Sequence, residues 1–356
     1  MSKIGILTFQ NTVNYGAALQ CFALYKTIEK LGHTPVVIDY KCPSIEISEG
    51  MLFDVRDPKS TLKYLLKARK RLAFKGFKSN ITYTPRCDKV TLPNVVSALD
   101  MVVVGSDQVW NPLLTNGDLS YFLSFEDEPE KCKTYAVSMG IKHFPSNEPF
   151  AQLISHFSSL LVRESSVAKE IERIAPDASD KASVVLDPTF LLTRDEWKGH
   201  AILPERIKGK DYVLLYSVSE FDRSAQIAKK LANKFNCEIV QIRQRRIGKI
   251  DKAIGFRNAS PEEFLGLFAN AKATVVSSFH GLCFSLIFQK EFYCTVSDKN
   301  SSRLTDLLAS LGVKDRVIYN DELPDCSSLD YLNQIEPKLK VLKSQSIECL
   351  NNSIGH

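Results

Sequence analysis

Short runs of β-branched and other apolar residues alternate with longer segments in which apolar residues recur every three or four positions. In the first half of the chain this pattern predicts strands at residues 3–9, 34–39, 100–104, 133–138, 159–163 and 183–186, and helices at residues 17–31, 149–158 and 166–174. In the second half it predicts strands at residues 211–218, 238–242, 273–277 and 292–296, and helices at residues 223–235, 261–269, 281–288 and 302–311. Strand patterns that are apolar at consecutive positions are typical of parallel sheets covered by helices on both faces.

The alternation of strand and helix indicates right-handed βαβ units. The sequence therefore predicts an α/β protein with two Rossmann-like domains and mostly parallel sheets, divided at a polar stretch near residues 193–210. We expect an N-terminal domain over residues 1–195, with a basic helical insertion at about residues 41–98, a C-terminal domain over residues 205–330, and a last helix over residues 331–356 that packs back on the body. In such pairs the ligand is expected between the domains, at the carboxyl ends of the strands.

The composition is that of an ordinary globular protein, with 356 residues of which 44% are hydrophobic and 24% charged. This excludes disordered, collagen-like and small disulfide-stapled classes. No apolar run reaches the ~20 residues that a membrane span needs, and the start of the chain lacks the pattern of a signal peptide. None of the nine cysteines forms a C-x-x-C pair, which favours reduced thiols over a zinc site. A cytoplasmic location is therefore expected.

The net charge of +5 is unevenly distributed, because residues 56–89 contain eleven Lys or Arg and only two Asp. Within this segment, leucines and other apolar residues fall near one face of a helix predicted over residues 61–79, and basic residues flank that face. One interpretation is a peripheral contact with an anionic membrane, at the inner face of the plasma membrane. The other is a helical insertion packed on the first domain with its charges in water. No nucleic-acid motif accompanies the segment, so nucleic acid is not expected as a partner.

Two polar loops follow predicted strands of the first domain. The loop with Asn14 and Tyr15 begins a helix, where backbone N–H groups can hold an anion or a sugar hydroxyl. Asp107 comes just after the strand at residues 100–104 and can accept a proton from a substrate hydroxyl; the alternative is a helix cap, with Trp110 in the core. Arg163, at the end of another strand, can clamp a carboxylate or phosphate, or else pair with its neighbour Glu164.

In the second domain a buried strand turns sharply into an apolar helix at Ser277, Ser278, His280 and Gly281. Backbone N–H groups at the start of that helix suit a phosphate, and His280 can donate a proton near neutral pH. The alternative is a histidine satisfied in the core. Three further basic residues follow two other predicted strands and could add positive charge to the site: Arg243, Lys299 and Arg303. The alternative is that they belong to a surface loop or to a solvated helix start.

Taken together, these motifs resemble the polysaccharide pyruvyl transferase family. The resemblance runs from about residue 4 to 318 and is carried by residues 14–17, 105–110, 135–138, 162–164, 186–189 and 278–281, together with Arg303. Ser278 is a departure, because some members have an arginine there, in front of Phe-His-Gly. The charge that binds the donor must then come from another residue: Arg163, Arg303, Lys299 or Arg243.

The resemblance implies a GT-B-like fold and transfer of a pyruvate unit from phosphoenolpyruvate to a sugar, with release of phosphate. The product is a ketal that bridges two hydroxyls in a bacterial capsule, exopolysaccharide or cell-wall polymer, and the acceptor is a sugar or a lipid-linked oligosaccharide. Phosphoenolpyruvate is then a co-substrate, and no cofactor is expected. No metal is expected either, since no cluster of His, Asp or Glu has ligand spacing.

In this scheme His280 is the general acid or the donor to phosphate, and Asp107 orients or deprotonates the acceptor. The first domain binds the acceptor through Asn14, Tyr15, Ser106, Trp110 and Asn111. Donor binding is assigned to Arg163, Ser277, Ser278, Gly281, Lys299, Arg303 and Arg243. The alternative functions are a GT-B-type glycosyltransferase with a nucleotide-sugar donor and a binding module for anionic sugars.

Overall fold

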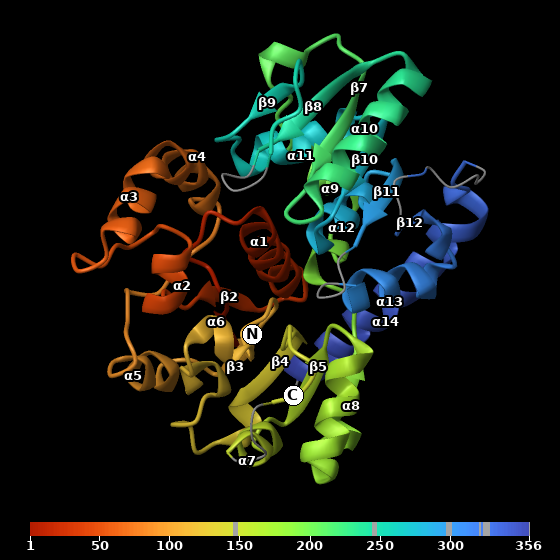
Figure 1. The fold of residues 1–356 in the computed structure, drawn as a ribbon. Coiled ribbons are helices and arrows are strands. Elements are labelled where there is room, and N and C mark those ends of the chain that lie inside the picture. The colour runs from red at the N-terminus through yellow and green to blue at the C-terminus, as the bar shows by residue number, and fades with distance from the viewer. Residues whose placement is uncertain (145–148, 244–247, 297–300, 320–321, 323–327, 356) are drawn as a thin grey trace. The chain divides into compact units, whose positions relative to one another are not determined.

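The structure is a computed structural model that describes residues 1–144, 149–243, 248–296, 301–319, 322 and 328–355 (Figure 1). The chain divides into two units, of which the first contains residues 1–192 and 342–356 and the second contains residues 193–341. Each unit has a six-stranded sheet in which neighbouring strands are parallel. The predicted fold class, an α/β protein with two Rossmann-like domains, is confirmed.

The sheet of the first unit has the strand order β2-β1-β3-β4-β5-β6. Its strands are β1 (Lys3–Leu7), β2 (Thr34–Val37), β3 (Met101–Val104), β4 (Cys132–Val137), β5 (Ser159–Val162) and β6 (Ala182–Val184). Every residue of β3 and β4 is buried, as the continuous apolar pattern of β3 predicts for a strand covered on both faces.

In the described part of the first unit, eight α-helices precede the connection to the second. They are α1 (Tyr15–Lys30), α2 (Pro43–Ser48), α3 (Pro58–Leu66), α4 (Ala68–Lys78), α5 (Leu92–Ser97), α6 (Pro112–Thr115), α7 (Phe150–Ser155) and α8 (Ser165–Ile174). The single helix predicted over residues 61–79 is wrong, because the segment forms α3 and α4 with a break at Lys67. The ammonium of Lys67 binds the carbonyl oxygen of Glu49 at 2.8 Å, a tertiary contact that helical periodicity does not reveal.

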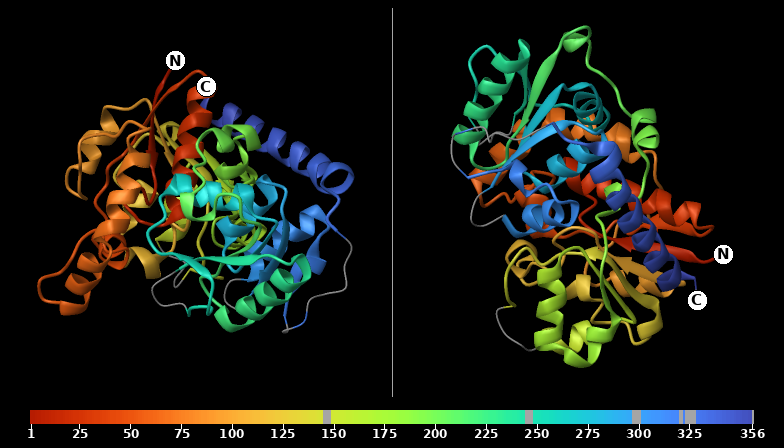
Figure 2. Two further views of the ribbon diagram at one scale, coloured as in Figure 1. Left: turned by 90° about the horizontal axis from the view of Figure 1, so that it is seen from above. Right: turned by 90° about the vertical axis from the view of Figure 1, so that its right-hand side faces the viewer.

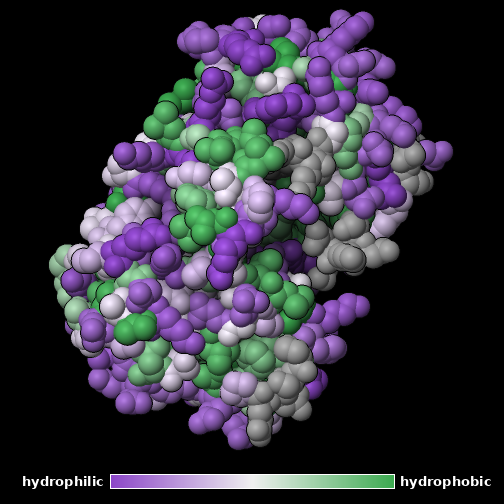
Figure 3. Space-filling model, turned by 60° about the vertical axis from the view of Figure 1, so that its left-hand side comes forward, coloured by the Kyte–Doolittle hydropathy of each residue, from purple (hydrophilic) through white to green (hydrophobic). Residues whose placement is uncertain are grey.

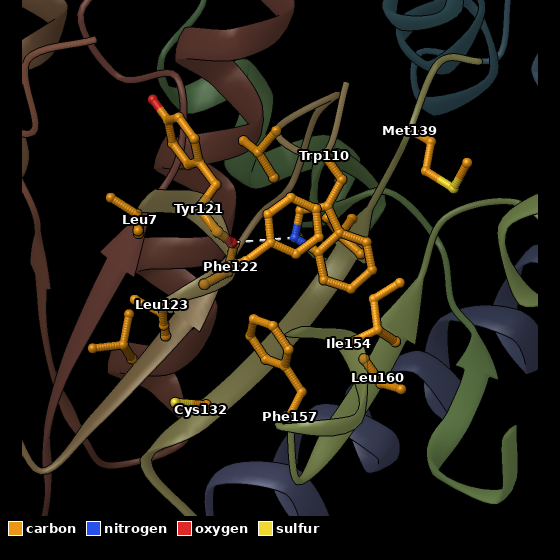
Figure 4. Close-up of a cluster of buried hydrophobic side chains, with 14 of the residues drawn as sticks. Leu7, Trp110, Tyr121, Phe122, Leu123, Cys132, Met139, Ile154, Phe157 and Leu160 are labelled. Carbon is orange, nitrogen blue, oxygen red and sulfur yellow. Dashed lines mark hydrogen bonds between the residues drawn. The ribbon is translucent and has the colours of Figure 1, made fainter. Parts of the chain in front are cut away.

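An aromatic cluster fills one side of the first sheet (Figure 4). Trp110 is fully buried and stacks on Phe122 with ring centroids 5.0 Å apart. Its indole N–H donates to the carbonyl oxygen of Tyr121 at 3.1 Å, which satisfies the one polar atom of the ring. The side chain of Trp110 therefore belongs to the core, as the alternative interpretation of this loop expects, and its contact with the acceptor stays a prediction.

The sheet of the second unit has the order β12-β11-β10-β7-β8-β9. Its strands are β7 (Tyr212–Tyr216), β8 (Glu238–Ile242), β9 (Ile254–Phe256), β10 (Ala273–Val276), β11 (Glu291–Thr295) and β12 (Val317–Ile318). Its helices are α9 (Arg194–Gly199), α10 (Phe221–Phe235), α11 (Pro261–Asn270), α12 (Phe279–Ile287), α13 (Ser301–Leu311) and the first part of α14 (Glu336–Ile354). The pattern did not predict the two short edge strands β9 and β12.

The end of α14 belongs to the first unit. Leu350 and Ile354 are fully buried in a cluster with Leu24 and Val103, and the hydroxyl of Ser346 accepts a hydrogen bond from the backbone N–H of Leu186 at 2.9 Å. Both termini of the chain therefore lie in this unit, close to one another (Figure 2).

Within the described ranges, no helix has the length and hydropathy needed to cross a bilayer, and the cysteines are free thiols.

Candidate active site

In the first unit the strand order reverses between β1 and β3. Ligands of open parallel sheets bind outside the carboxyl ends of the strands at such a point. The two loops singled out in the sequence follow these two strands, and buried hydrogen bonds join them. The hydroxyl of Thr8 donates to the carbonyl oxygen of Ser106 at 2.9 Å, and the backbone N–H of Ser106 donates to the side-chain oxygen of Gln20 at 3.2 Å.

Asp107 lies in this second loop with a backbone φ of +75°. Its half-buried carboxylate accepts a hydrogen bond from the backbone N–H of Gln108 at 2.8 Å. A left-handed conformation costs a residue other than glycine roughly 1–2 kcal/mol, although aspartate tolerates it better than most. Such strain is concentrated at functional sites, which favours a chemical role for Asp107. At Gly105, before it, a Cβ atom would lie 2.4 Å from the carbonyl oxygen of Tyr135, so a side chain does not fit there.

Beside this loop, Arg163 is held by two carboxylates. Its guanidinium lies 3.1 Å from Asp187 Oδ2 and 3.4 Å from Glu164 Oε2, and only 2% of its side chain is exposed. Burial acts to lower the pKa of Arg163, but the negative charges of Glu164, Asp187 and Asp107 outweigh it and raise the pKa above its ordinary value. The guanidinium is therefore charged, and direct contact between Arg163 and a donor stays a prediction.

Asp187 and Ser138 also belong to this group, although their sequence positions alone did not indicate a role. Asp187 also accepts hydrogen bonds from the hydroxyl and the backbone N–H of Thr189, and the hydroxyl of Ser138 donates to Glu164. Both residues lie in segments that carry the family resemblance, residues 135–138 and 186–189. That resemblance was the signal that could have marked them as site residues. Three carboxylates around one guanidinium leave this loop region negatively charged, which suits acceptance of a proton from a neutral hydroxyl.

The residues predicted to bind the acceptor differ in accessibility. Asn14 is exposed and caps α1, where its side-chain oxygen accepts a hydrogen bond from the backbone N–H of Gly16 at 2.9 Å. Tyr15, Ser106 and Asn111 are buried, and their contact with the acceptor stays a prediction. The ring of Tyr15 packs under α4, and the other two shape the loop after β3 through internal hydrogen bonds.

In the second unit the strand order reverses between β7 and β10. Ser277, which follows β10, is 2% exposed, and its hydroxyl oxygen accepts hydrogen bonds from the backbone N–H groups of Val218 at 2.8 Å and Ser219 at 3.0 Å. Ser277 therefore fixes the loop after β7 to the loop after β10. Ser217 and Ser219 of this loop were not predicted as site residues. Their position after a predicted strand was the signal that could have indicated them.

Ser278 is the N-cap of α12, and its hydroxyl accepts a hydrogen bond from the backbone N–H of Gly281 at 3.0 Å. A Cβ atom on Gly281 would lie 2.9 Å from that hydroxyl oxygen, so glycine lets the first turn pack closely. His280 is half-buried in this turn, with its ring 5.5 Å from that of Phe279 and edge-on to it. The first turn of a helix favours anions, so the imidazole stands where a phosphate would be stabilised.

The other predicted donor residues are less well defined. Arg243 directly follows β8, and its backbone N–H donates to the carbonyl oxygen of Phe256 at 2.7 Å. Arg303 is half-buried in the first turn of α13. Lys299 lies outside the described residues. The part of the chain that the structure describes contains no group of three or more His, Cys, Asp or Glu side chains that could hold a metal ion.

Solved structures with a similar fold include the UDP-GlcNAc 2-epimerase of Methanocaldococcus jannaschii in complex with UDP-GlcNAc and UDP. It shares 14% sequence identity with this chain, at a TM-score of 0.50 over 97% of this chain and 99% of that one. The UDP-GlcNAc 2-epimerase of Neisseria meningitidis bound to UDP-GlcNAc shares 12% identity, at a TM-score of 0.50 over 99% and 92%. These similarities confirm the GT-B-like fold. At such low sequence identity they carry no information on function.

A comparison with curated protein sequences gives no significant match. The family model for polysaccharide pyruvyl transferases matches residues 14–299, which include the loops after β1, β3 and β10. Because this match spans most of the chain, the protein belongs to the polysaccharide pyruvyl transferase family.

Proposed function

We propose that the protein transfers a pyruvate unit from phosphoenolpyruvate to two hydroxyls of a sugar, forming a ketal and releasing phosphate. The sugar is part of a bacterial capsule, exopolysaccharide or cell-wall polymer, at the stage of a cytoplasmic and in some cases lipid-linked intermediate. The observation that carries the proposal is the position of His280 in the first turn of α12, beside the cap Ser278, in a chain of this family.

The donor carries a carboxylate and a phosphate, so its binding requires several cationic or N–H groups. The backbone N–H groups and the dipole at the start of α12 favour the phosphate. Arg303 and Arg243 follow strands of the same unit and supply positive charge, as Lys299 would. The second unit thus takes the anionic donor, while the carboxylate-rich loops of the first unit take the neutral hydroxyls of the acceptor.

The reaction begins with protonation of the methylene carbon of the donor by His280. The electron pair of the C=C bond forms the new C–H bond, and positive, oxocarbenium-like character develops at the neighbouring carbon. A sugar hydroxyl adds to that carbon and loses its proton to Asp107. Phosphate leaves with the electrons of its C–O bond, and the second hydroxyl adds to the same carbon, closes the ketal and gives its proton to the departing phosphate. Because side chains and the phosphate carry out these proton transfers, we expect the rate to be unchanged in EDTA.

The test is phosphate release from phosphoenolpyruvate by the purified chain in the presence of an acceptor oligosaccharide. General acid–base groups contribute ~100- to 10,000-fold, so His280→Ala should lower turnover by about that factor. His33→Ala, a change at a histidine far along the chain from the site loops, is the matched control and should leave turnover unchanged. Near-full activity of a folded His280→Ala variant would refute the assignment. Thermal stabilisation by nucleotide sugars but not by phosphoenolpyruvate would favour a glycosyltransferase instead.

A further inference from the structure

Helices α3 and α4 lie at the edge of the first unit (Figure 1; two further views in Figure 2). Several of their leucines are exposed to solvent. Leu62, Leu65 and Leu66 follow the i, i+3, i+4 spacing of one helical face of α3, and they are 53%, 62% and 52% exposed. Leu72 of α4 is 72% exposed. Single exposed leucines are common, but four within two consecutive short helices form an apolar surface that the first unit itself does not cover.

The opposite face of α4 is firmly held. Phe74 packs on Tyr15 of α1 with ring centroids 5.1 Å apart, and Phe77 packs on Phe22 at 5.0 Å. Phe74 and Phe77 are fully or almost fully buried. The two faces of α4 thus differ sharply: one belongs to the core of the unit, and the other carries Leu72 outward. Leu72 therefore belongs to a packed helix and not to a loosely attached segment. Helix α3 is tied to α4 by a hydrogen bond from the guanidinium of Arg71 to the carbonyl oxygen of Tyr64.

Positive charge surrounds these leucines. Arg69 and Lys75 lie three residues before and three residues after Leu72, and Lys59 lies at the start of α3. All three basic side chains are exposed, and none of them makes an ion pair within the part of the chain that the structure describes. Figure 3 brings this side of the molecule forward and shows hydrophobic and hydrophilic residues side by side on it. A surface with this composition matches an interface that is apolar inside and anionic outside.

We propose that this α3–α4 surface, formed by Lys59, Leu62, Leu65, Leu66, Arg69, Leu72 and Lys75, docks on a bilayer that contains anionic lipids. The leucines enter the boundary between headgroups and acyl chains, while the basic side chains stay at the level of the anionic headgroups. A second copy of the chain is a poor occupant, because two surfaces of the same positive sign repel one another. The inference rests on α3 and α4 alone and does not depend on the proposed donor or acceptor.

The experiment is flotation of the full chain with vesicles of phosphatidylglycerol and phosphatidylcholine, and with vesicles of phosphatidylcholine alone. We expect binding to the anionic vesicles only, and weaker binding at high salt. The triple variant Leu65→Gln, Leu66→Gln, Leu72→Gln should bind at least about ten-fold more weakly. Each basic residue near an anionic surface strengthens binding about five-fold, so the double variant Arg69→Gln, Lys75→Gln should bind the anionic vesicles about 25-fold more weakly. Leu332→Gln, at an exposed leucine outside this surface, is the matched control.

All of these side chains are exposed, so the variants should melt at the temperature of the unchanged protein, and the melting curve checks this. Absence of binding to either kind of vesicle would overturn the proposal, as would equal binding to both. Unchanged binding of the triple variant would overturn it as well. A dimer that the triple change dissociates, without vesicle binding, would assign the surface to a second copy and reject the membrane.

Discussion

Arg163 and Asp187 form an ion pair, 3.1 Å between Nη1 and Oδ2, in which 2% of the arginine side chain and none of the aspartate side chain is exposed. The arginine directly follows β5, and the aspartate follows β6. The pair therefore joins the carboxyl ends of two neighbouring strands beside the loop that carries Asp107. A buried pair of this kind contributes mainly by keeping each charge compensated, since a lone charge in the same place is very unfavourable.

The first prediction concerns the loss of one partner. Asp187→Ala removes one of the carboxylates that compensate the buried guanidinium, and we expect it to lower the free energy of unfolding by about 3–5 kcal/mol. Asp187→Asn keeps an oxygen that accepts the hydrogen bonds from Thr189, so it should lower the free energy of unfolding by less. Urea unfolding followed by tryptophan fluorescence measures both, because Trp110 is buried in the same unit. A cost below about 1 kcal/mol for the alanine variant would show that the pair has little influence on the fold.

The second prediction separates the chemistry of Asp107 from its backbone conformation. Asn and Asp tolerate a positive φ, and an asparagine can still accept the hydrogen bond from the backbone N–H of Gln108. Asp107→Asn should therefore change stability by less than about 0.5 kcal/mol while it lowers turnover ~100- to 10,000-fold. Asp107→Ala loses the hydrogen bond, and alanine lacks the polar side chain that makes a positive φ tolerable, so this variant should also unfold more readily. Measured together, thermal melts and phosphate release distinguish the two effects. Full turnover of Asp107→Asn would exclude a role as base.

The third prediction compares two adjacent serines of the second unit. Ser277→Ala removes the acceptor of two backbone N–H groups, and because this site is buried we expect a loss of about 2–3 kcal/mol. Ser278→Ala removes only a helix cap, which typically costs about 1 kcal/mol. Urea titrations of both variants test the order. If Ser278→Ala proved the more destabilising change, the bridge between the loops after β7 and β10 would be of minor importance.

The strands could be predicted where they are buried on both faces. Residues 101–104 and 273–276 are apolar at nearly every position, and the structure places β3 and β10 there with all residues buried. The short strands β9 and β12 could not be found, because two or three residues contain no recognisable period. At Lys67, where the basic helix divides, the side chain contacts Glu49, eighteen residues earlier in the chain, and a local pattern does not include such a contact.

The site loops could be located for a related reason. A polar residue directly after an apolar strand must lie at the carboxyl edge of a parallel sheet, and this brought out Asp107 and His280. Whether a loop residue is accessible could not be predicted. Ser106 is buried through its contact with Thr8, which lies 98 residues away in the sequence. Composition and spacing hold no information on such long-range pairs. The burial of Tyr15, Ser106, Trp110 and Asn111 could therefore not be predicted, and their contact with the acceptor stays a prediction.

The last prediction is a pH dependence that arises outside the site, at Glu170 of α8. Its carboxylate accepts hydrogen bonds from the guanidinium of Arg173 at 2.7 and 2.8 Å, from His143 at 2.9 Å and from the backbone N–H of Phe144 at 2.9 Å. These contacts, with Arg173 first, outweigh burial and lower the pKa of Glu170 to about 2. The folded state therefore holds the ionised carboxylate more strongly than the unfolded chain does.

Because the pKa of Glu170 is lower in the folded state than in the unfolded chain, stability falls as the pH is lowered. The stabilisation by Glu170 is fully present above the ordinary glutamate pKa of 4.5 and is lost as the pH falls towards about 2. The full shift corresponds to roughly 3 kcal/mol, and we expect about 1–2 kcal/mol because Arg173 and His143 are partly exposed to screening solvent. The measurement is urea unfolding of the unchanged protein and of Glu170→Gln between pH 6 and 2. The stability difference between them should be constant near pH 6 and vanish towards pH 2, and Arg173→Gln should reduce its value near pH 6. A difference that grows on acidification would contradict this assignment, since protonation then would stabilise the folded carboxyl group.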